Sequence, residues 1–322
     1  MSIITRTSHA PAPSPGERGG QIVIRLSTPS DRDAILAFIA RMGFNPRDTI
    51  TWDGLHMCAM TAWMGEQLIG AIPLEPRHLR VSKNDVLRSV HETVVAVDPQ
   101  FRGSGIGSRL QEAIAQQRPG GARIVTVFRE EPSSLAYRWY LKNGFFKAVQ
   151  IVSWMCEQPA SIADKRAPRI WRAADAPWDE IETARSEGLI GAVERKSQPL
   201  RAWLAVHPYR QKYAFHVVSD GSGAFALLGA GTMHSQTLRA EVLEFIAKDA
   251  ESARSLLCAV AAAAMRENWK PIRFPLAMND PNAGVAQSLG FTSGWTFDML
   301  VRPLDPDVTL TDSVQGNVRL EE

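Results

Sequence analysis

The apolar positions of the chain change their spacing repeatedly, and this pattern predicts short strands that alternate with amphipathic helices. Apolar runs rich in β-branched residues predict the strands of the first half, at 21–26, 55–81 (a hairpin that turns at Gly65-Glu66), 89–97, 124–128 and 145–155. Apolar residues three and four positions apart predict its helices, at 35–42, from Gly105 to before Pro119, and from Pro132 to Asn143. The first half is therefore predicted to be mixed α/β.

The second half repeats part of this order. Its pattern predicts strands and helices in a similar succession, with strands at 224–233, 240–247 and 272–276 and helices at 252–268 and 281–289. Gly290-Phe291 follows the last of these helices, as Gly144-Phe145 follows the third helix of the first half. Few residues are identical between the two halves, but the common order indicates two related domains.

Stretches rich in proline, glycine or charge predict where the domains end. We expect five parts, namely a flexible tail at 1–20, a first domain at 21–157, a linker at 158–168, a second domain at 169–304 and a tail at 305–322. Two domains also suit a chain of 322 residues, because domains usually hold about 100–200 residues.

Composition and charge exclude several classes of protein. The 36 basic and 34 acidic residues leave a net charge of +2, which is too balanced for a general nucleic-acid binder. No apolar stretch approaches the roughly 20 residues of a membrane-spanning helix, so we expect no membrane association. Cys58, Cys156 and Cys258 are too few and too far apart for a disulfide scaffold, which suits a cytoplasmic protein. Neither H-E-x-x-H nor paired C-x-x-C occurs, and no metal site is expected.

The segment from Val97 to Gly107, VDPQFRGSGIG, carries the most specific chemical signal. A predicted strand leads into a glycine-rich turn and then a helix N-terminus, where free amides and the positive helix end favour a phosphate group. Glycine lets the backbone approach an anion closely, and Arg102 adds a permanent positive charge. Ser108 stands where a dinucleotide fingerprint has its third glycine, which argues against a Rossmann oxidoreductase.

In this segment the chain resembles the GNAT superfamily of acyl-CoA N-acyltransferases. Arg102, Gly105 and Gly107 meet the family's pyrophosphate signature, (Gln/Arg)-x-x-Gly-x-(Gly/Ala). The run WYLKNGF, residues 139–145, resembles its second motif and lies at the usual distance from the first. The clear resemblance covers roughly residues 21–157. Together with the repeated order of elements in the second half, it implies two GNAT-like α/β domains, each with a mixed, mostly antiparallel sheet flanked by helices.

The resemblance also implies acetyl-CoA as co-substrate and gives roles to particular residues. Tyr140 is expected to protonate the departing CoA thiolate. Ser133 stands where the family often has an asparagine that holds the pantetheine arm. The strand and the turn are expected to hold the cofactor, at Val95, Ala96, Val97, Arg102, Gly103, Ser104, Gly105, Ile106, Gly107 and Ser108.

A primary amine is protonated at neutral pH, so a base must take a proton before the amine can attack a thioester. The family usually places this base on the strand ahead of the turn, where His91 and Glu92 are the candidates. In a regular strand His91 shares a face with Thr93, Val95 and Val97, whereas Glu92 points the other way. A bulge would exchange the faces and favour Glu92. We favour His91 as the base and keep Glu92 as the alternative.

The sequence therefore predicts an N-acetyltransferase that moves an acetyl group from acetyl-CoA directly to a primary amine of a small molecule or a peptide. The alternative is a non-catalytic acyl-CoA sensor, which would bind the cofactor and modify no acceptor. A homodimer is a further expectation, and neither nucleic acid nor a membrane is expected as a partner.

The second domain is expected to lack the cofactor site and to have a structural or substrate-shaping role. Its junction between strand and helix, residues 246–254, contains no glycine, and Asp249 and Glu251 would repel a phosphate. Ala286 stands four residues before Gly290, the position that Tyr140 holds before Gly144 in the first domain.

Overall fold

A single 14-stranded sheet organises the computed structural model, which describes residues 21–44, 58–80, 86–130, 132–163, 168–186, 193–194, 201, 204, 213–231 and 239–308. Its strands are β1 Ile22–Leu26, β2 Cys58–Met64, β3 Gln67–Arg80, β4 Val86–Glu92, β5 Ala96–Val97, β6 Ile124–Arg129, β7 Phe146–Cys156, β8 Arg169–Arg172, β9 Val193–Glu194, β10 Tyr213–Ser219, β11 Phe225–Gly231, β12 Arg239–Ile246, β13 Ile272–Ala277 and β14 Thr292–Pro303. The α-helices are α1 Arg32–Arg41, α3 Ile106–Gln117, α4 Leu135–Lys142, α5 Trp178–Ser186, α7 Ala250–Glu267 and α8 Pro281–Ser288.

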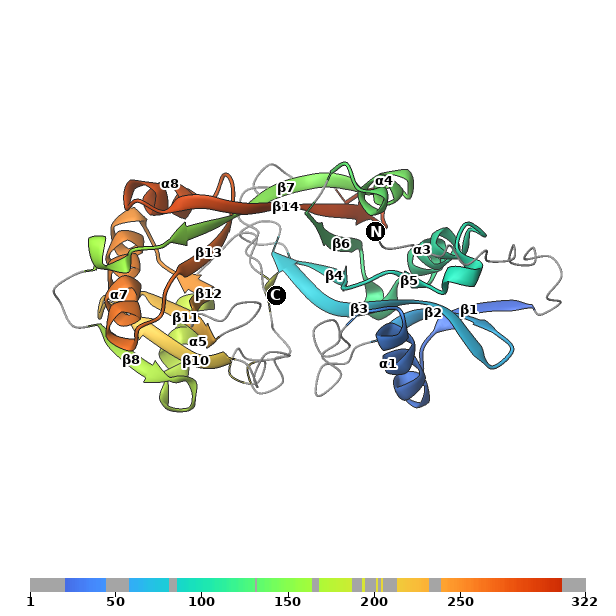
Figure 1. Cartoon of the computed structure of the whole chain (residues 1–322), viewed down its shortest axis with the longest axis horizontal. Coiled ribbons are helices and arrows are strands. Elements are labelled where there is room, and N and C mark those ends of the chain that lie inside the picture. Colours follow the sequence, from blue (N-terminus) through green and yellow to red (C-terminus); the bar gives the residue numbers. More distant parts are fainter. Residues whose placement is uncertain are drawn as a thin grey trace, which may run out of the picture.

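The strands cross the sheet in the order β1-β2-β3-β4-β6-β14-β7-β13-β12-β11-β10-β8, with β5 and β9 paired to β3. Figure 1 shows two lobes, which correspond to the two halves of the chain and are bridged by the long strands β7 and β14. Most neighbours are antiparallel, but β4 with β6 and β12 with β13 are parallel. The predicted mixed α/β fold is confirmed, although the sheet runs through both halves where one sheet per domain was expected.

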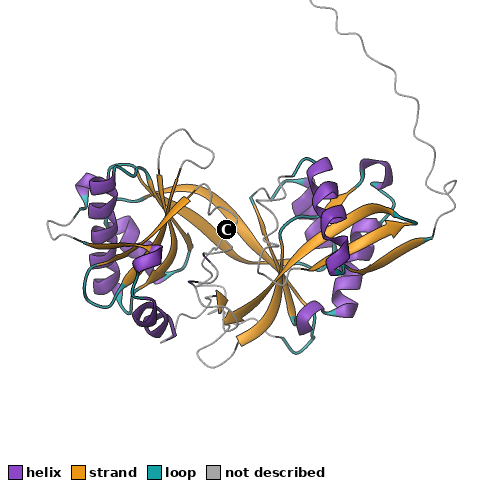
Figure 2. Cartoon of the chain, turned by 90° about the horizontal axis from the view of Figure 1, so that it is seen from below, coloured by secondary structure: helices purple, strands orange, loops and turns teal. Residues whose placement is uncertain are grey.

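The bridge between the lobes is an exchange of strand ends. Residues 298–303 of β14 pair with β6 in the first half, while residues 151–156 of β7 pair with β13 in the second half. The two long strands also pair with each other in antiparallel register. Each half therefore completes its sheet with a strand that continues into the other half, and Figure 2 shows these strands passing between the lobes.

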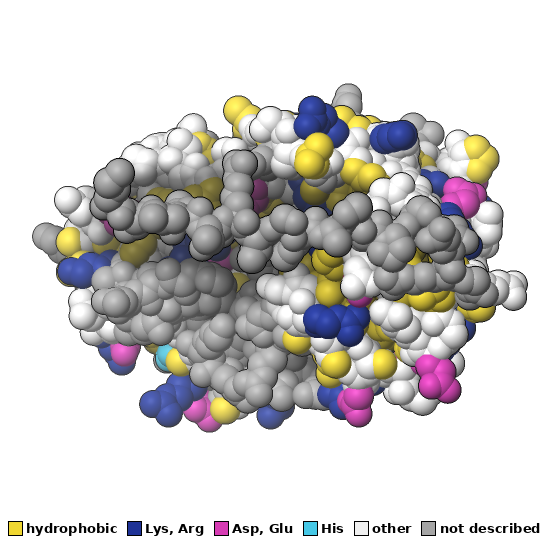
Figure 3. All heavy atoms as spheres, turned by 45° about the vertical axis from the view of Figure 1, so that its right-hand side comes forward, with side chains coloured by type: hydrophobic (Ala, Val, Ile, Leu, Met, Phe, Trp, Pro, Cys, Tyr) yellow, Lys and Arg dark blue, Asp and Glu magenta, His cyan; other side chains and the backbone are white. Residues whose placement is uncertain are grey.

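Helices cover both faces of the sheet in each half. In the first half α3 and α4 pack on one face and α1 packs on the other, over separate clusters of buried apolar residues. In the second half α7 and α8 share one face, and α5 lies on the opposite one. On the surface that Figure 3 draws, basic and acidic side chains are interspersed, as the balanced composition implies.

Two predicted elements differ from the structure. The strand expected over 89–97 is interrupted, because β4 ends at Glu92 and β5 begins only at Ala96. The helix expected from Pro132 begins at Leu135, because the hydroxyl of Ser134 accepts a hydrogen bond from a backbone amide of its first turn.

The predicted domain boundaries stay predictions. Residues 1–20, 164–167 and 309–322, from the predicted tails and linker, lie outside the described residues.

The residues just after β14 are bound to the first half. Asp305 forms ion pairs with Arg118 and with Arg123, the second at 2.9 Å. Asp307 also pairs with Arg123, at 3.1 Å, but its side chain is 75% exposed. The segment predicted as a C-terminal tail therefore begins with residues that contact the end of α3 and the start of β6.

A buried carboxylate on β14 holds helix α4 in place. Asp298 is 2% exposed and accepts a hydrogen bond of 2.8 Å from the hydroxyl of Tyr137 on α4. It also pairs with Lys147 at 2.8 Å and accepts a longer bond from Gln150. Burial and this carboxylate raise the pKa of Tyr137 to about 12, so the phenol stays a donor. The helix is thus fastened by a residue 161 positions away in the sequence.

We expect Asp298→Ala to lower the free energy of unfolding by ~2–4 kcal/mol, because it leaves buried donors of Tyr137 and Gln150 without their acceptor. Asp307→Ala removes an exposed ion pair and should cost at most ~1 kcal/mol. Urea unfolding of both variants measures the difference. Equal costs for the two would show that Asp298 does not fasten α4.

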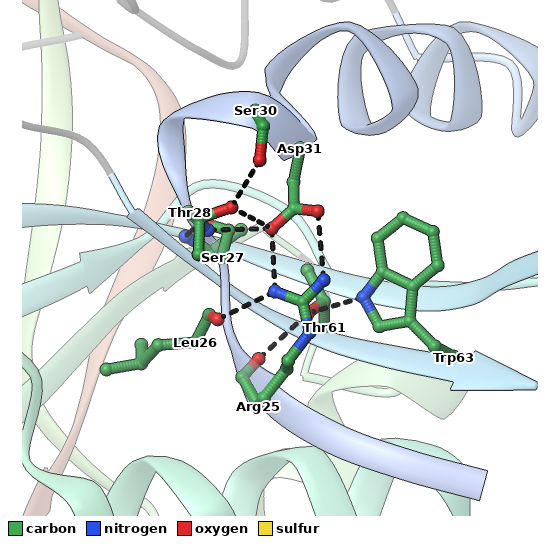
Figure 4. Close-up of polar contacts among 9 residues, drawn as sticks. Arg25, Leu26, Ser27, Thr28, Ser30, Asp31, Thr61 and Trp63 are labelled. Atoms are coloured by element: carbon green, nitrogen blue, oxygen red, sulfur yellow. Dashed lines mark hydrogen bonds and ion pairs between the residues drawn. The ribbon is translucent and has the colours of Figure 1, made fainter. Parts of the chain in front are cut away.

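A second polar cluster joins β1 to the start of α1 (Figure 4). Arg25 donates to both carboxylate oxygens of Asp31, at 2.6 and 2.9 Å, and its guanidinium lies over the ring of Trp63. The amide and the hydroxyl of Thr28 donate to the same carboxylate, at 2.7 and 2.9 Å. These contacts, with Arg25 as the main cause, hold the pKa of Asp31 well below its usual range.

Asp31→Asn should therefore destabilise the protein by ~1–2 kcal/mol at pH 7. Because the folded-state pKa of Asp31 is lowered, its contribution is present above the pKa of an unfolded aspartate, about 4, and is lost as the pH falls below it. Urea unfolding at pH 7 and at pH 3 should show the difference from wild type shrinking at the lower pH. Asp33→Asn, at an exposed position of α1, is the control and should show little change at either pH.

Candidate active site

The parallel strands β4 and β6 separate in the middle of the first half. They pair from Ser89 opposite Ile124 to His91 opposite Thr126. Residues 93–95 then belong to no strand, and β5 pairs with β3. Among the described pairs, β5, the strand that leads into the glycine-rich turn, is therefore hydrogen-bonded to β3 and not to β6.

The glycine-rich turn presents a row of free backbone amides. Gly103 and Gly105 both have φ of 81°, in the left-handed region that favours glycine. In the described part of the chain, the amides of Gly103 and of residues 105–108 donate to no acceptor. A Cβ at Gly103 or Gly105 would meet open space. With the positive end of α3 behind them, these amides form a site for an anion.

Polar side chains flank this turn. Arg102 is exposed, and its Nε donates to the carbonyl of Val97 at 3.0 Å, which keeps the guanidinium beside the turn. Ser104 donates to the carbonyl of Phe101 at 2.5 Å. Ser108 is exposed on the first turn of α3, and Ser133 is exposed in the turn ahead of α4. Their predicted contacts with a cofactor stay predictions.

Gly107 has a packing role that the motif does not reveal. A Cβ at this position would lie 3.0 Å from the indole ring of Trp139 on α4. Such a contact is tight enough to push the two helices apart. The second glycine of the motif therefore allows α4 to lie close against the first turn of α3, which brings the neighbouring Tyr140 toward the turn.

Tyr140 lies buried between a cation and a carboxyl group. It is 1% exposed, and its hydroxyl accepts a hydrogen bond of 2.5 Å from Arg129 at the end of β6. The guanidinium of Arg129 also lies 4.4 Å from the centre of the phenol ring. Burial and the charge of Glu92 raise the pKa of Tyr140 well above 10, while Arg129 opposes this shift. The phenol therefore holds its proton throughout the neutral range.

Glu92 faces the helices α3 and α4. It is 1% exposed, and Nε2 of Gln111 on α3 donates to both of its oxygens, at 2.7 and 2.8 Å. Burial raises the pKa of Glu92 to about 7, although hydrogen bonds from Gln111 and Tyr140 and the charge of Arg129 favour the ionised form. This carboxyl group therefore exchanges a proton near neutral pH.

His91 points to the opposite face of the sheet. Its Nδ1 lies 2.9 Å from the hydroxyl of Thr126, and its ring lies 4.7 Å from that of Phe128. Burial, with the charges of Arg77 and Arg129, lowers the pKa of His91 well below 6.5, so the imidazole is neutral at pH 7.

The expectation that His91 shares a face with Val95 and Val97 is wrong. Those two residues pack with the apolar cluster under α3, on the side where Glu92 lies, while Val94 and Ala96 face α1. The interruption after Glu92 shifts the alternation of side chains, as a bulge would. The structure thus places the two candidate bases on different faces of the sheet, and the roles of both stay predictions.

Three buried polar atoms near the separating strands have no hydrogen-bond partner among the described residues. They are Oγ1 of Thr93, Oε1 of Gln111 and Nε of Arg129. Gln111 and Arg129 belong to the cluster around Glu92 and Tyr140, and Thr93 follows Glu92 in the chain. Buried polar groups are nearly always paired, so each of these atoms is a candidate contact for a bound molecule. The free amides of the turn suit the anionic group of such a molecule.

The corresponding place in the second half has neither a glycine-rich turn nor a phenol. Helix α7 is capped by Asp249, whose carboxylate accepts from the amide of Ser252 at 2.8 Å, so its N-terminus carries an anion of its own. Ala286 of α8 accepts from the amide of Phe291 as Tyr140 accepts from that of Phe145, at 3.1 and 3.2 Å. Ala286 therefore stands where the first half has its phenol.

Sequence reasoning missed Arg129, Gln111 and Asp298. Nothing in the sequence marks them, because they belong to no motif, and only the packing of α3, α4 and β14 brings them to the site.

Among the described residues, no group of three or more His, Cys, Asp or Glu side chains is placed to hold a metal ion. None of the described helices is long and apolar enough to span a membrane.

Residues 56–147 match the family described as acetyltransferase (GNAT) domain. The chain therefore carries a GNAT acetyltransferase domain, and the resemblance inferred from the two motifs is confirmed. Members of this family use acetyl-CoA. A search of curated proteins by sequence finds no match.

Solved structures share the fold over most of the chain. Eis1 from Mycobacterium abscessus is 16% identical with a TM-score of 0.63, over 88% of this chain and 74% of that one. A probable N-acyltransferase from Enterococcus faecalis is 13% identical with a TM-score of 0.66, over 88% and 73%. A tandem GNAT protein from the clavulanic acid biosynthesis pathway is 13% identical with a TM-score of 0.53, over 89% and 100%. Both halves are covered, so the fold is of the tandem GNAT type.

We expect one acetyl-CoA per chain, bound at the turn of the first half, and no binding of NAD. Gly105→Val should weaken acetyl-CoA binding strongly, because the side chain would occupy the open space before the free amides. Gly43→Val is the control, since Gly43 also has positive φ and open surroundings but lies after α1. Titration calorimetry on the full-length wild type and on both variants measures the affinity and the number of sites. Two sites in wild type, or one surviving in Gly105→Val, would place a cofactor site in the second half.

Proposed function

We propose that the protein transfers the acetyl group of acetyl-CoA to a primary amine of a small molecule or a peptide, with both substrates bound at once. The observation that carries this proposal is the buried cluster of Tyr140, Arg129 and Glu92, which lies beside the free-amide turn where β4 and β6 separate. A structural turn alone would need neither a buried phenol between charges nor a row of unbonded amides. In the proposed site the amides and Arg102 bind the pyrophosphate.

Tyr140 is the proton donor to the thiolate that leaves. Its raised pKa keeps it protonated at neutral pH, and Arg129 stabilises the negative charge that develops on its oxygen when the proton is given away. The helix that carries it is fixed from two sides, by the contact of Trp139 with Gly107 and by the bond of Tyr137 to Asp298. These contacts support a precisely held acid.

His91 and Glu92 stay the two candidates for the base, and the shift in the alternation favours Glu92, which lies on the face of the free-amide turn. His91 lies on the other face of the sheet. It is neutral at pH 7, so one ring nitrogen is free to accept a proton from the amine, directly or through water. The hydroxyl of Thr126 orients the ring through Nδ1.

The second half is proposed to be non-catalytic. Its helix α7 is capped by Asp249, and Ala286 replaces the phenol. Its contribution to the site is made through β14, which supplies the carboxylate that holds α4. The predicted homodimer, the absence of nucleic-acid partners and the cytoplasmic location stay predictions.

The test of the proposed function is a screen of amines for the release of free CoA thiol from acetyl-CoA. The panel holds polyamines, aminoglycosides, amino acids, arylalkylamines and peptide N-termini. Turnover with any of them supports the transferase and names the class of acceptor. Tight binding of acetyl-CoA without turnover across the panel would favour the acyl-CoA sensor.

Tyr140→Phe should lower turnover by about 100- to 10,000-fold and leave the affinity for acetyl-CoA nearly unchanged, because the hydroxyl acts when charge develops on sulfur. Tyr137→Phe is the matched control on the same helix. It removes a hydroxyl that bonds to Asp298, so it should lower stability but change turnover much less. Steady-state rates and calorimetry measure both effects. Wild-type turnover in Tyr140→Phe, with chemistry limiting the rate, would remove Tyr140 as the acid.

A further inference from the structure

Gln111 is a buried amide on a helix face that is otherwise apolar. The other buried residues of α3 are Ile106, Leu110, Ala113 and Ile114. Gln111 is 1% exposed, although a buried amide costs free energy unless its polar atoms find partners. An apolar side chain would fill this position without that cost, so the glutamine indicates a specific task.

The side chain of Gln111 meets the carboxyl group of Glu92. Its Nε2 donates to both carboxylate oxygens, at 2.7 and 2.8 Å, whereas its Oε1 has no hydrogen-bond partner among the described residues. A carboxylate can only accept, so this contact also fixes which end of the amide faces it. In the described part of the chain, the hydrogen bonds of this side chain therefore serve Glu92 alone.

The backbone of Gln111 is held by the strand that comes from the second half. Nη1 of Arg302 on β14 donates to the carbonyl of Gln111 at 3.2 Å. Nη2 of the same guanidinium lies 3.6 Å from the carboxylate of Glu112, the next residue of α3. The amide is thus anchored at its backbone while its side chain reaches across to β4.

Glu92 stands where a base is useful. It is the last residue of β4, directly before residues 93–95, which belong to no strand, and it lies on the face of the free-amide turn. An ionised carboxylate has about four lone-pair positions. Gln111 occupies a position on each oxygen, so each oxygen keeps another that can take a proton from an amine, directly or through water.

Other elements surround Glu92 with charged and apolar groups. The ionisable groups that act on it are the cations of Arg129 on β6 and Arg302 on β14 and the phenol of Tyr140 on α4. On β3 the apolar Leu74 stands opposite it in the register. Burial raises the pKa of Glu92 to about 7, and the bonds from the glutamine are the largest influence that opposes this shift. Loss of those bonds therefore raises the pKa further.

We propose that Gln111 is the positioning residue of the base, and that it holds both oxygens of Glu92 so that their remaining lone pairs take a proton from the acceptor amine. This inference rests on the proposed acetyl transfer, and it selects Glu92 over His91. Glu92 takes one proton from the ammonium, as an N–H bond breaks and its own O–H bond forms, and releases it to solvent before the next turnover. The second proton that nitrogen loses as the amide forms also goes to solvent. Tyr140 gives one proton to the thiolate and regains one from solvent, so the protons balance.

The test is the pH dependence of turnover in Gln111→Met, which keeps the length of the side chain and removes both donors. Turnover is measured by release of CoA thiol with the most active amine of the panel. Because Glu92 stays protonated to higher pH in this variant, its turnover relative to wild type should be reduced at least about tenfold at pH 6 and recover to within about threefold at pH 9. Protonation of the amine affects both proteins alike and cancels in this ratio. A merely structural loss would give the same ratio at every pH.

Gln116→Met is the matched control, because Gln116 is exposed on the same helix and donates to Glu112 at 3.2 Å. It should leave turnover and its pH dependence unchanged. Glu92→Gln should lower turnover at least about 100-fold, and adding Gln111→Met to it should lower turnover less than about twofold further, because no base is left to position. Thermal unfolding confirms that each variant is folded.

Infrared titration observes the carboxyl group without turnover. The carbonyl band of protonated Glu92, identified by its absence in Glu92→Gln, should persist to higher pH in Gln111→Met than in wild type. A band that titrates at the same pH in both proteins would overturn the role of Gln111.

The turnover outcomes separate this role from the proposed transfer. With an active wild type, a ratio that does not change with pH, an undiminished effect of Gln111→Met in the Glu92→Gln background, or near-wild-type turnover of Glu92→Gln would overturn the role of Gln111 and leave the transferase intact. If wild type acetylates no amine, the proposed transfer itself fails, and the positioning of its base fails with it.

Discussion

The exchange of strand ends between the two halves is the constraint on which the rest of the structure depends. Without β14, strands β6 and β7 of the first half would have no common neighbour, and the ladder that joins them would be missing. Without β7, strand β13 of the second half would have an open edge. Unpaired buried backbone groups cost too much for either half to keep this arrangement alone. Neither half can therefore complete its sheet without the other.

The same exchange brings two further charged residues to the candidate site. Asp298 and Arg302 lie on β14, four residues apart, and both act on groups of the first half. Asp298 binds Tyr137 on the helix of the acid, and Arg302 favours the ionised form of Glu92. The second half, which has no glycine at its junction of strand and helix and has Ala286 where the first half has Tyr140, thus still contributes to the other site.

The two motifs identified the first half as GNAT-like because each depends on the backbone geometry of a few neighbouring residues. The glycines at 103 and 105 adopt positive φ, and the following helix begins at Ile106, as a free-amide turn requires. The alternation along β4 could not be predicted, because the interruption after Glu92 depends on the pairing of β5 with β3. The packing of Gly107 against Trp139 could not be predicted either, since it depends on how two helices pack.

The sequence by itself determined the elements, the glycine-rich turn, the phenol of Tyr140 and the loss of both features in the second half, because each is encoded within a few neighbouring residues. Only the tertiary structure decided which faces His91 and Glu92 occupy, which cation lies against Tyr140, and which strand closes each half of the sheet. These depend on residues far apart in the chain, such as Tyr137 and Asp298. Local pattern carries no information on such contacts, which are set by the register of strands and the packing of side chains.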